Sequence, residues 1–67
     1  MIFGEHLKNI RQSKNLTQKQ LAELIGISER GIQNYEMGVR KPNFDIIIKL
    51  ADALNISTDY LLGRTNN

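Results

Sequence analysis

The sequence predicts a small all-α domain of five helices. Three observations favour this fold class: apolar residues recur at intervals of three and four residues, four of the five stretches follow a residue type that starts helices, and no segment alternates apolar and polar residues as a strand does. A chain of 67 residues has room for one hydrophobic core. We therefore expect residues 1–67 to form a single domain.

The first expected helix carries its apolar residues on one face, at Phe3, Leu7 and Ile10. This pattern fades at residues 13–15, whose polar residue types favour a turn. A second helix follows directly. Thr17 can cap it and form a capping box with Gln20, and the helix is expected to end near Ile25.

The third expected helix is joined to the second by a very short turn. Ser28 can cap its start, and Gly38 can end it in a left-handed conformation. Only Gly26 and its neighbours separate the two helices, and a turn of about three to four residues with a glycine makes them cross steeply. Ala22 has a small side chain that allows a close approach. The spacing therefore predicts a helix-turn-helix.

The last two expected helices follow the single proline. Asn43 can cap the fourth helix, and Asn55 can end it. The apolar stripe of this helix consists of Ile47, Leu50, Ala51 and Leu54. Ser57 opens a short fifth helix that ends near Gly63, and residues 64–67 are expected to fray.

The composition excludes several classes of protein. The chain has no cysteine and one histidine, His6, for which we expect a surface role, so no metal site is predicted. Apolar runs are far shorter than the roughly 20 residues of a membrane span, and the N-terminus lacks the features of an export signal. We therefore expect a cytoplasmic location and no membrane contact.

An enzyme is not expected. The chain has no glycine-rich phosphate-binding motif. Ser57, Asp59 and His6 have the residue types of a hydrolytic triad, but Ser57 is explained as a helix cap and no oxyanion loop accompanies it. No cofactor is expected either.

Further motifs surround the predicted turn: Leu16-Thr17-Gln18-Lys19-Gln20-Leu21-Ala22, Gly26-Ile27-Ser28 and Ile32-Gln33-Asn34-Tyr35-Glu36-Met37-Gly38. They resemble the Cro and phage-repressor type helix-turn-helix proteins, and Lys41-Pro42, residues 50–57 and residues 60–63 extend the similarity over about residues 3–63. The resemblance implies a compact, lambda-repressor-like, five-helix DNA-binding domain, commonly a homodimer on a two-fold symmetric operator. Met37 and Gly31 depart from the family pattern.

Four side chains of the third helix are candidates to read DNA bases. The N-terminal part of a recognition helix points at base edges in the major groove. Arginine can bind guanine, glutamine or asparagine can bind adenine, and glutamate can accept from cytosine. The candidates are Glu29, Arg30, Gln33 and Asn34. For each, the alternative is a solvated polar helix face.

Contacts to the DNA backbone need hydrogen-bond donors. The candidates are Gln18, Lys19, Ser28, Arg40 and Lys41. Gln18 also matches a glutamine of the family, whereas Lys19 is equally well explained as a solvated lysine. The net charge is +2, with seven basic and four acidic residues up to residue 41 and two and three after it, a weak indication of an anionic partner.

The resemblance also implies structural roles. Arg11 and Glu36 are expected to form an ion pair, so that Glu36 is not a catalytic acid. The implied homodimer contact lies around the fifth helix and the loop before the fourth, with Asn43, Tyr60 and Leu61 as candidates. Leu61 suits the core equally well.

We therefore expect a sequence-specific transcriptional regulator, most simply a repressor, whose third helix enters the major groove of double-stranded DNA at an inverted-repeat operator. The alternative is an antitoxin-like or adaptor module that holds another protein. Such a module would more readily carry an apolar patch on this face, and Met37 is the only indication of one. Any protein partner or antirepressor stays unspecified.

Overall fold

A computed structural model describes residues 2–64. Of the expected frayed tail at residues 64–67, residues 65–67 lie outside this range, whereas the Arg64 N–H donates to the Asp59 carbonyl at 2.8 Å. Across the described residues the chain forms five helices and no strand, which confirms the all-α fold class. The helices are α1 (Phe3–Ser13), α2 (Gln18–Ile25), α3 (Glu29–Met37), α4 (Phe44–Leu54) and α5 (Thr58–Leu61). Within residues 2–64, none of these helices is long and apolar enough to cross a membrane.

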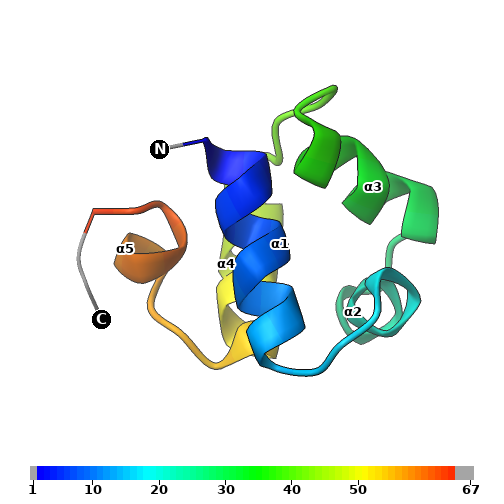
Figure 1. Cartoon of the computed structure of the whole chain (residues 1–67), viewed down its shortest axis with the longest axis horizontal. Coiled ribbons are helices and arrows are strands. Elements are labelled where there is room, and N and C mark those ends of the chain that lie inside the picture. The colour runs from blue at the N-terminus through cyan, green and yellow to red at the C-terminus, as the bar shows by residue number, and fades with distance from the viewer. Residues whose placement is uncertain (1, 65–67) are drawn as a thin grey trace.

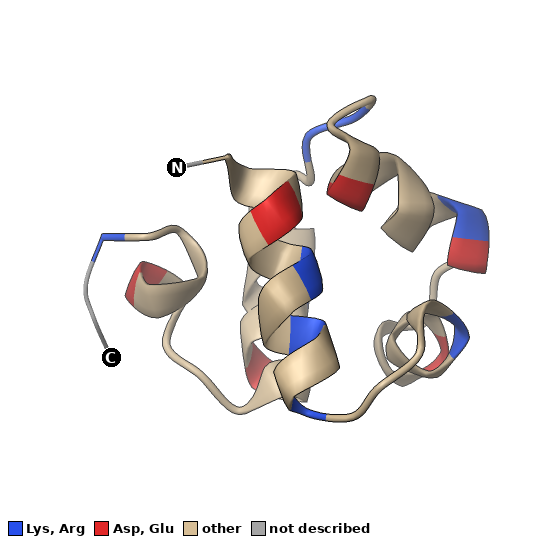
Figure 2. Cartoon of the chain, viewed as in Figure 1, with Lys and Arg blue, Asp and Glu red and all other residues tan. Residues whose placement is uncertain are grey.

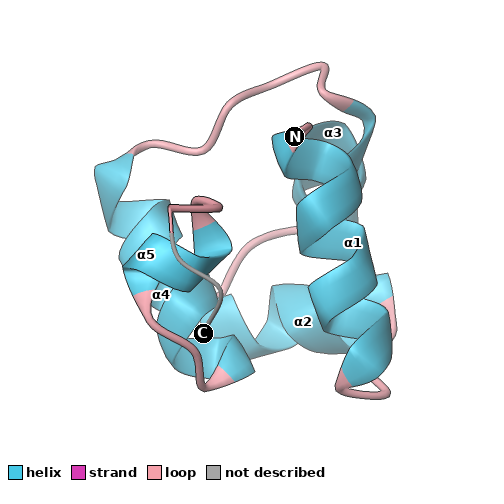
Figure 3. Ribbon diagram, turned by 60° about the vertical axis from the view of Figure 1, so that its left-hand side comes forward, coloured by secondary structure: helices cyan, strands magenta, loops and turns pink. Residues whose placement is uncertain are grey.

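The helices surround one core. α2 packs against both α3 and α4, α1 packs against α3, and α5 packs against α4. α2 and α3 lie on one side of the molecule and α5 on the opposite side (Figure 1). The turned view in Figure 3 separates α1 and α3 from α4 and α5, and the connection from α3 to α4 crosses one end of the molecule.

Each helix contributes to this core. Its buried residues are Leu7, Ile10, Leu21, Ala22, Ile25, Ile32, Ile47, Leu50, Ala51, Leu54 and Leu61. Leu61 was expected either as a dimer contact or as a core residue, and its 0% exposure shows that it belongs to the core. Its side chain anchors α5 on the core and is closed to a partner.

Local side-chain caps start four helices. The side chains of Thr17, Ser28, Asn43 and Ser57 each accept the backbone N–H three residues further on. Gln20 completes the capping box by accepting the N–H of Thr17 at 2.8 Å. Such caps contribute about 1 kcal/mol each, so the starts of α2 to α5 are fixed by neighbouring residues, as expected.

The turn between α2 and α3 has the expected left-handed glycine. Gly26 has φ 77° and ψ 31°, a conformation that glycine adopts without steric cost. The backbone N–H groups of Gly26 and Ile27 both donate to the Ala22 carbonyl, at 2.9 and 3.0 Å. α2 is seen almost end-on in Figure 1 whereas α3 runs across the view, so the helices cross steeply. This geometry confirms the helix-turn-helix.

α1 and α3 come very close at Gly4. A Cβ atom on Gly4 would lie 2.2 Å from the carbonyl oxygen of Glu36 and 2.8 Å from that of Tyr35. Both are backbone atoms of a helix, which cannot move aside as a side-chain end can. The sequence pattern assigned Gly4 no role, and only the contact between α1 and α3 shows why a glycine is needed there.

Replacing Gly4 with alanine should therefore destabilise the fold, although alanine is normally the better helix former by about 0.5–1 kcal/mol. Overpacking typically costs about 1–3 kcal/mol, so the urea midpoint measured by circular dichroism should fall. The control is Gly31→Ala in α3, where the added Cβ meets only side-chain atoms, the flexible end of Ile27 at 3.0 Å and Ser28 Oγ at 3.6 Å. Equal midpoints for the two variants would contradict the role of Gly4.

Candidate nucleic-acid interface

A buried ion pair connects α1 to α3. The Arg11 guanidinium donates from Nε to Glu36 Oε2 at 2.6 Å and from Nη2 to Oε1 at 3.1 Å, which is a two-bond contact. The two side chains are only 8% and 4% exposed. A third donor, Arg11 Nη1, bonds the Leu16 carbonyl in the α1–α2 loop at 2.7 Å. The structure thus contains the ion pair that the resemblance implied.

Gln18 extends this network to α2. Its Nε2 atom donates to Glu36 Oε1 at 3.0 Å. Gln18 is the first residue of α2 and is half-buried. One carboxylate on α3 therefore holds side chains from both preceding helices, a connection that the sequence pattern did not indicate.

The N-terminus of α2 offers free hydrogen-bond donors. The first four N–H groups of a helix have no partner within it. The capping box uses those of Thr17 and Gln20, at 2.8 and 3.0 Å. The N–H groups of Gln18 and Lys19 remain, and the Lys19 side chain is exposed beside them. Such a helix end favours an anion.

The start of α3 is the exposed part of the expected recognition helix. Glu29 and Arg30 are exposed. Gln33 and Asn34 are half-buried, although the helical period places them on the outward face. Ser28 is exposed, and its Oγ accepts the Gly31 N–H at 3.1 Å. Its own hydroxyl hydrogen can still be donated. Figure 2 shows a basic and an acidic segment next to each other at the start of α3.

The loop after α3 is bonded to the backbone of Asn34. The backbone N–H groups of Val39 and Arg40 donate to the Asn34 carbonyl at 2.9 and 3.3 Å, so the chain turns back over the end of α3. Arg40 and Lys41 are exposed in this loop. Figure 2 shows this basic segment at the end of α3 away from the turn.

Residues at the α5 side form other contacts. His6 is half-buried, and its Nε2 lies 2.8 Å from the Tyr60 carbonyl, so the expected surface role is not observed. Because a carbonyl only accepts, His6 must donate this bond. The His6 and Tyr60 rings meet edge to face at 5.6 Å. The exposed Asn43 accepts the Ile46 N–H at 2.9 Å.

No group of three or more His, Cys, Asp or Glu side chains that could hold a metal ion occurs among residues 2–64. The polar clusters that do occur are used internally: Glu36 by Arg11 and Gln18, and Ser57 as the cap of α5. Unused donors are present at the start of α2, at the start of α3 and in the loop after α3.

The capped helices and their tight turn define a helix-turn-helix protein. The model of the helix-turn-helix family HTH_3 matches residues 7–61. The chain belongs to this family.

Curated relatives are similar over nearly the whole chain. The HTH-type transcriptional regulator ImmR of Bacillus subtilis is 44% identical over 64 residues, which are 96% of this chain and 50% of ImmR. The cryptic phage CTXphi transcriptional repressor RstR of Vibrio cholerae is 47% identical over 64 residues, 96% of this chain and 57% of RstR. The chain thus spans about half the length of these relatives, which are named as regulators and not as enzymes.

A solved structure shares the fold. The P22 c2 repressor, crystallised in complex with a synthetic operator, superimposes with a TM-score of 0.89 and 29% sequence identity. The superposition covers 97% of this chain and 98% of that one. The expected lambda-repressor-like arrangement of five helices is therefore confirmed.

Removing one partner of the buried ion pair should strongly destabilise the domain. Glu36→Ala leaves the Arg11 charge buried and unpaired, which typically costs about 3–5 kcal/mol. A domain of 67 residues has roughly 3–10 kcal/mol in total. The control is the double variant Arg11→Met/Glu36→Leu, which should stay folded because both charges are replaced by apolar groups. Urea unfolding measures both, and a double variant less stable than Glu36→Ala would contradict this account.

Proposed function

We propose that this chain is a sequence-specific DNA-binding transcriptional regulator, most simply a repressor, that inserts α3 into the major groove of double-stranded DNA. One observation carries the proposal: in a helix-turn-helix, the N-terminus of α2, which has two unused N–H groups, is bonded through Gln18 to Glu36 of α3, the helix whose start is exposed and charged. Reading bases requires side chains that reach base edges, and positioning requires donors to phosphates. The fold shared with the P22 c2 repressor, crystallised with an operator, supports this mode of binding.

Arg30 is the best-placed base contact. It is exposed at the second position of α3, and its planar group can donate to both acceptors of guanine. Glu29 is equally exposed and could accept from cytosine, but nearby phosphates repel its charge. Gln33 and Asn34 are half-buried and would contact bases only where the groove floor meets the middle of α3.

The proposed backbone contacts surround these residues. Ser28 offers a hydroxyl before the start of α3, and Arg40 and Lys41 are exposed in the loop after its end. Gln18 and Lys19 offer backbone N–H groups and side-chain donors at the start of α2, where Gln18 bonds Glu36 of α3. Such donors can fix the register of the recognition helix on the duplex, since phosphate contacts set position and orientation.

The antitoxin-like or adaptor alternative has less support. The relatives over this segment are named as transcriptional regulators and a repressor. Exposed Met37 and Val39 provide some apolar surface at the end of α3, but the start of α3 is charged. The proposed function needs no cofactor, and it agrees with a cytoplasmic location because it requires access to DNA.

Selection of bound duplexes from a random pool tests the function and provides an operator. On that operator, Arg30→Ala should lose about 1–3 kcal/mol of binding free energy and relax the preference at one base position. Lys49→Ala on α4 is a control that removes the same charge from an exposed position outside α2 and α3. An equal loss for Arg30→Ala on random-sequence DNA would contradict base reading.

We also propose that the regulator binds as a homodimer. One short recognition helix reads few base pairs, whereas a cellular regulator needs specific binding about a thousandfold or more above non-specific binding. Two copies related by a two-fold axis would place their α3 helices about 34–36 Å apart in successive major grooves. The operator would then be an inverted repeat.

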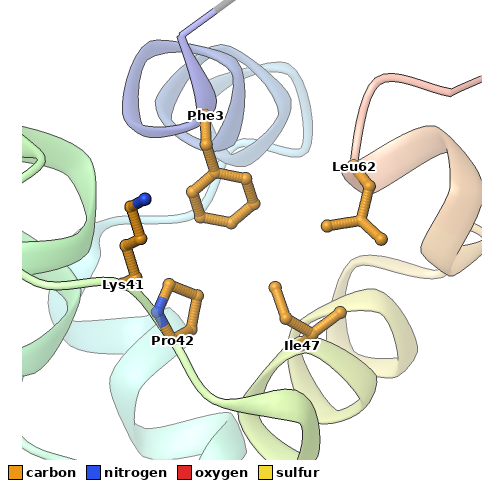
Figure 4. Close-up of a pocket in the computed structure, with 5 residues that line it drawn as sticks. All are labelled: Phe3, Lys41, Pro42, Ile47 and Leu62. Carbon is orange, nitrogen blue, oxygen red and sulfur yellow. The ribbon is translucent and has the colours of Figure 1, made fainter.

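The apolar surface nearest to the expected dimer contact is a pocket between the start of α1, the α3–α4 loop, α4 and the end of α5. It has a volume of about 320 Å³ and is lined by Phe3, Lys41, Pro42, Ile47 and Leu62. In Figure 4 these side chains surround a common space, into which Phe3, Ile47 and Leu62 point. Leu62 is 40% exposed and Phe44, beside Asn43, is 76% exposed. We propose that these two, in place of the buried Leu61, contact the second copy together with Asn43 and Tyr60.

The dimer surface can be tested by sedimentation with the selected operator. The unaltered chain should form a complex of two copies on one duplex, with half-site centres about one helical turn apart. Phe44→Ser/Leu62→Ser should weaken this complex and leave one copy on a half-site duplex. Leu24→Ser removes an exposed leucine from α2 and serves as control. A one-to-one complex of the unaltered chain on a non-repeated site would contradict the dimer.

A further inference from the structure

The Glu36 carboxylate accepts more hydrogen bonds than its ion pair requires. Arg11 already donates to both oxygens, at 2.6 and 3.1 Å, and both side chains are nearly inaccessible to solvent. The two-bond contact compensates the buried charge. The additional bond from Gln18 Nε2 to Glu36 Oε1, at 3.0 Å, therefore has a separate consequence, which is to fix the side chain of Gln18.

The chemistry of this bond allows one orientation of the Gln18 amide. An ionised carboxylate only accepts, so the nitrogen of the amide must face Glu36 and the amide oxygen must point elsewhere. An amide nitrogen carries two hydrogens. Glu36 takes one of them, and the second is available to a further acceptor because Gln18 is only half-buried.

The Gln18 side chain belongs to the first residue of α2, where the backbone N–H groups of Gln18 and Lys19 are unused. A phosphate at this place would meet donors from backbone and side chain together. Glu36 is itself a residue of α3, near the end of that helix. The bond thus links the side-chain donor on α2 directly to the helix that reads bases.

We propose that Glu36 is a positioning residue for DNA binding: it holds the Gln18 amide so that the remaining N–H meets a phosphate in fixed register with α3. This inference rests on the proposed function. The rotamer freedom of Gln18 is lost when the protein folds and not when DNA binds, which favours binding. Arg11 neutralises the Glu36 charge, so the carboxylate can lie behind a phosphate contact without strong repulsion.

The test compares the effect of Gln18→Ala in two backgrounds. One is the unaltered chain, and the other is Arg11→Met/Glu36→Leu, which removes the carboxylate and the opposite charge together. Dissociation constants are measured for the selected operator and for a random-sequence duplex of about 20 base pairs, a length that covers two successive major grooves. In the unaltered chain, Gln18→Ala should weaken binding to both duplexes about tenfold, since a hydrogen bond to a charged group is lost.

The Arg11→Met/Glu36→Leu variant should itself bind about tenfold more weakly than the unaltered chain, because its Gln18 amide is no longer held. Adding Gln18→Ala to this variant should then change the dissociation constant less than about twofold, since the hydrogen bond to phosphate is already lost. Lys19→Ala is the matched control, because the Lys19 side chain is exposed. Lys19→Ala should raise the dissociation constant by one and the same factor in the two backgrounds. An equal cost of Gln18→Ala in both backgrounds would overturn the positioning role.

The salt dependence separates this role from a direct contact by Arg11. Gln18 carries no charge, so the slope of log K against log salt concentration should be the same in both backgrounds. A slope smaller by about 0.9 in the double variant would mean that Arg11 itself neutralises a phosphate, and that result would overturn the proposal.

A second variant leaves the ion pair intact in case the double variant does not fold. Gln18→Asn keeps the amide but shortens the side chain, so it cannot bridge Glu36 and a phosphate. It should bind both duplexes as weakly as Gln18→Ala, and binding at the unaltered strength would refute the positioning role.

If the unaltered chain binds neither duplex, the proposed function itself fails, which is a different result from binding without coupling between Gln18 and Glu36.

Discussion

The buried ion pair between Arg11 and Glu36 is the interaction on which the arrangement of the first three helices depends. Apolar contacts bring these helices together but tolerate small shifts in register. A two-bond guanidinium–carboxylate contact at 2.6 and 3.1 Å does not, because its geometry is planar and directional. The same two side chains also bond Leu16 and Gln18. The loop before α2 is therefore held by Arg11 of α1, and the start of α2 is held by Glu36 of α3.

A second contact between α1 and α3 lies at Gly4, near the other end of α1. The absence of a Cβ at Gly4 lets the backbone of α1 approach the carbonyl of Glu36, while Arg11, two turns further along α1, reaches the Glu36 side chain. α1 is thus held to α3 at both of its ends, once by close backbone packing and once by charge. A domain this small has limited apolar surface to bury, so such contacts provide part of the stability that a larger core would provide.

The sequence predicts those parts of the fold that depend on neighbouring residues. Caps at Thr17, Ser28, Asn43 and Ser57 and left-handed ends at Gly26, Gly38 and Asn55 involve contacts within a few positions, and all were expected. Contacts between distant residues were not visible in this way. The bond between His6 and Tyr60 joins residues 54 positions apart, and the Arg11–Glu36 pair was expected only through the family resemblance.

The candidate site shows the same division. Exposure of Arg30 follows from the helical period, whereas Gln33 and Asn34, which the same period places on the outward face, are half-buried. Leu61 and Leu62 are adjacent at α5, and their side chains point about 100° apart around the helix axis. Which of the two is buried therefore depends on how the helix is rotated about its axis. Only the packing of α5 on α4 shows that Leu61 enters the core and that Leu62 remains accessible.

The shortness of α5 has a consequence for assembly. A helix of four residues does not persist in water without support. α5 exists because Leu61 is anchored in the core and because His6 of α1 bonds the Tyr60 carbonyl. The surface around Leu62 is therefore formed only when the first and last helices are both in place. A contact made through α5 would therefore require a fully folded chain. Partly folded chains would lack the α5 surface and could not pair through it.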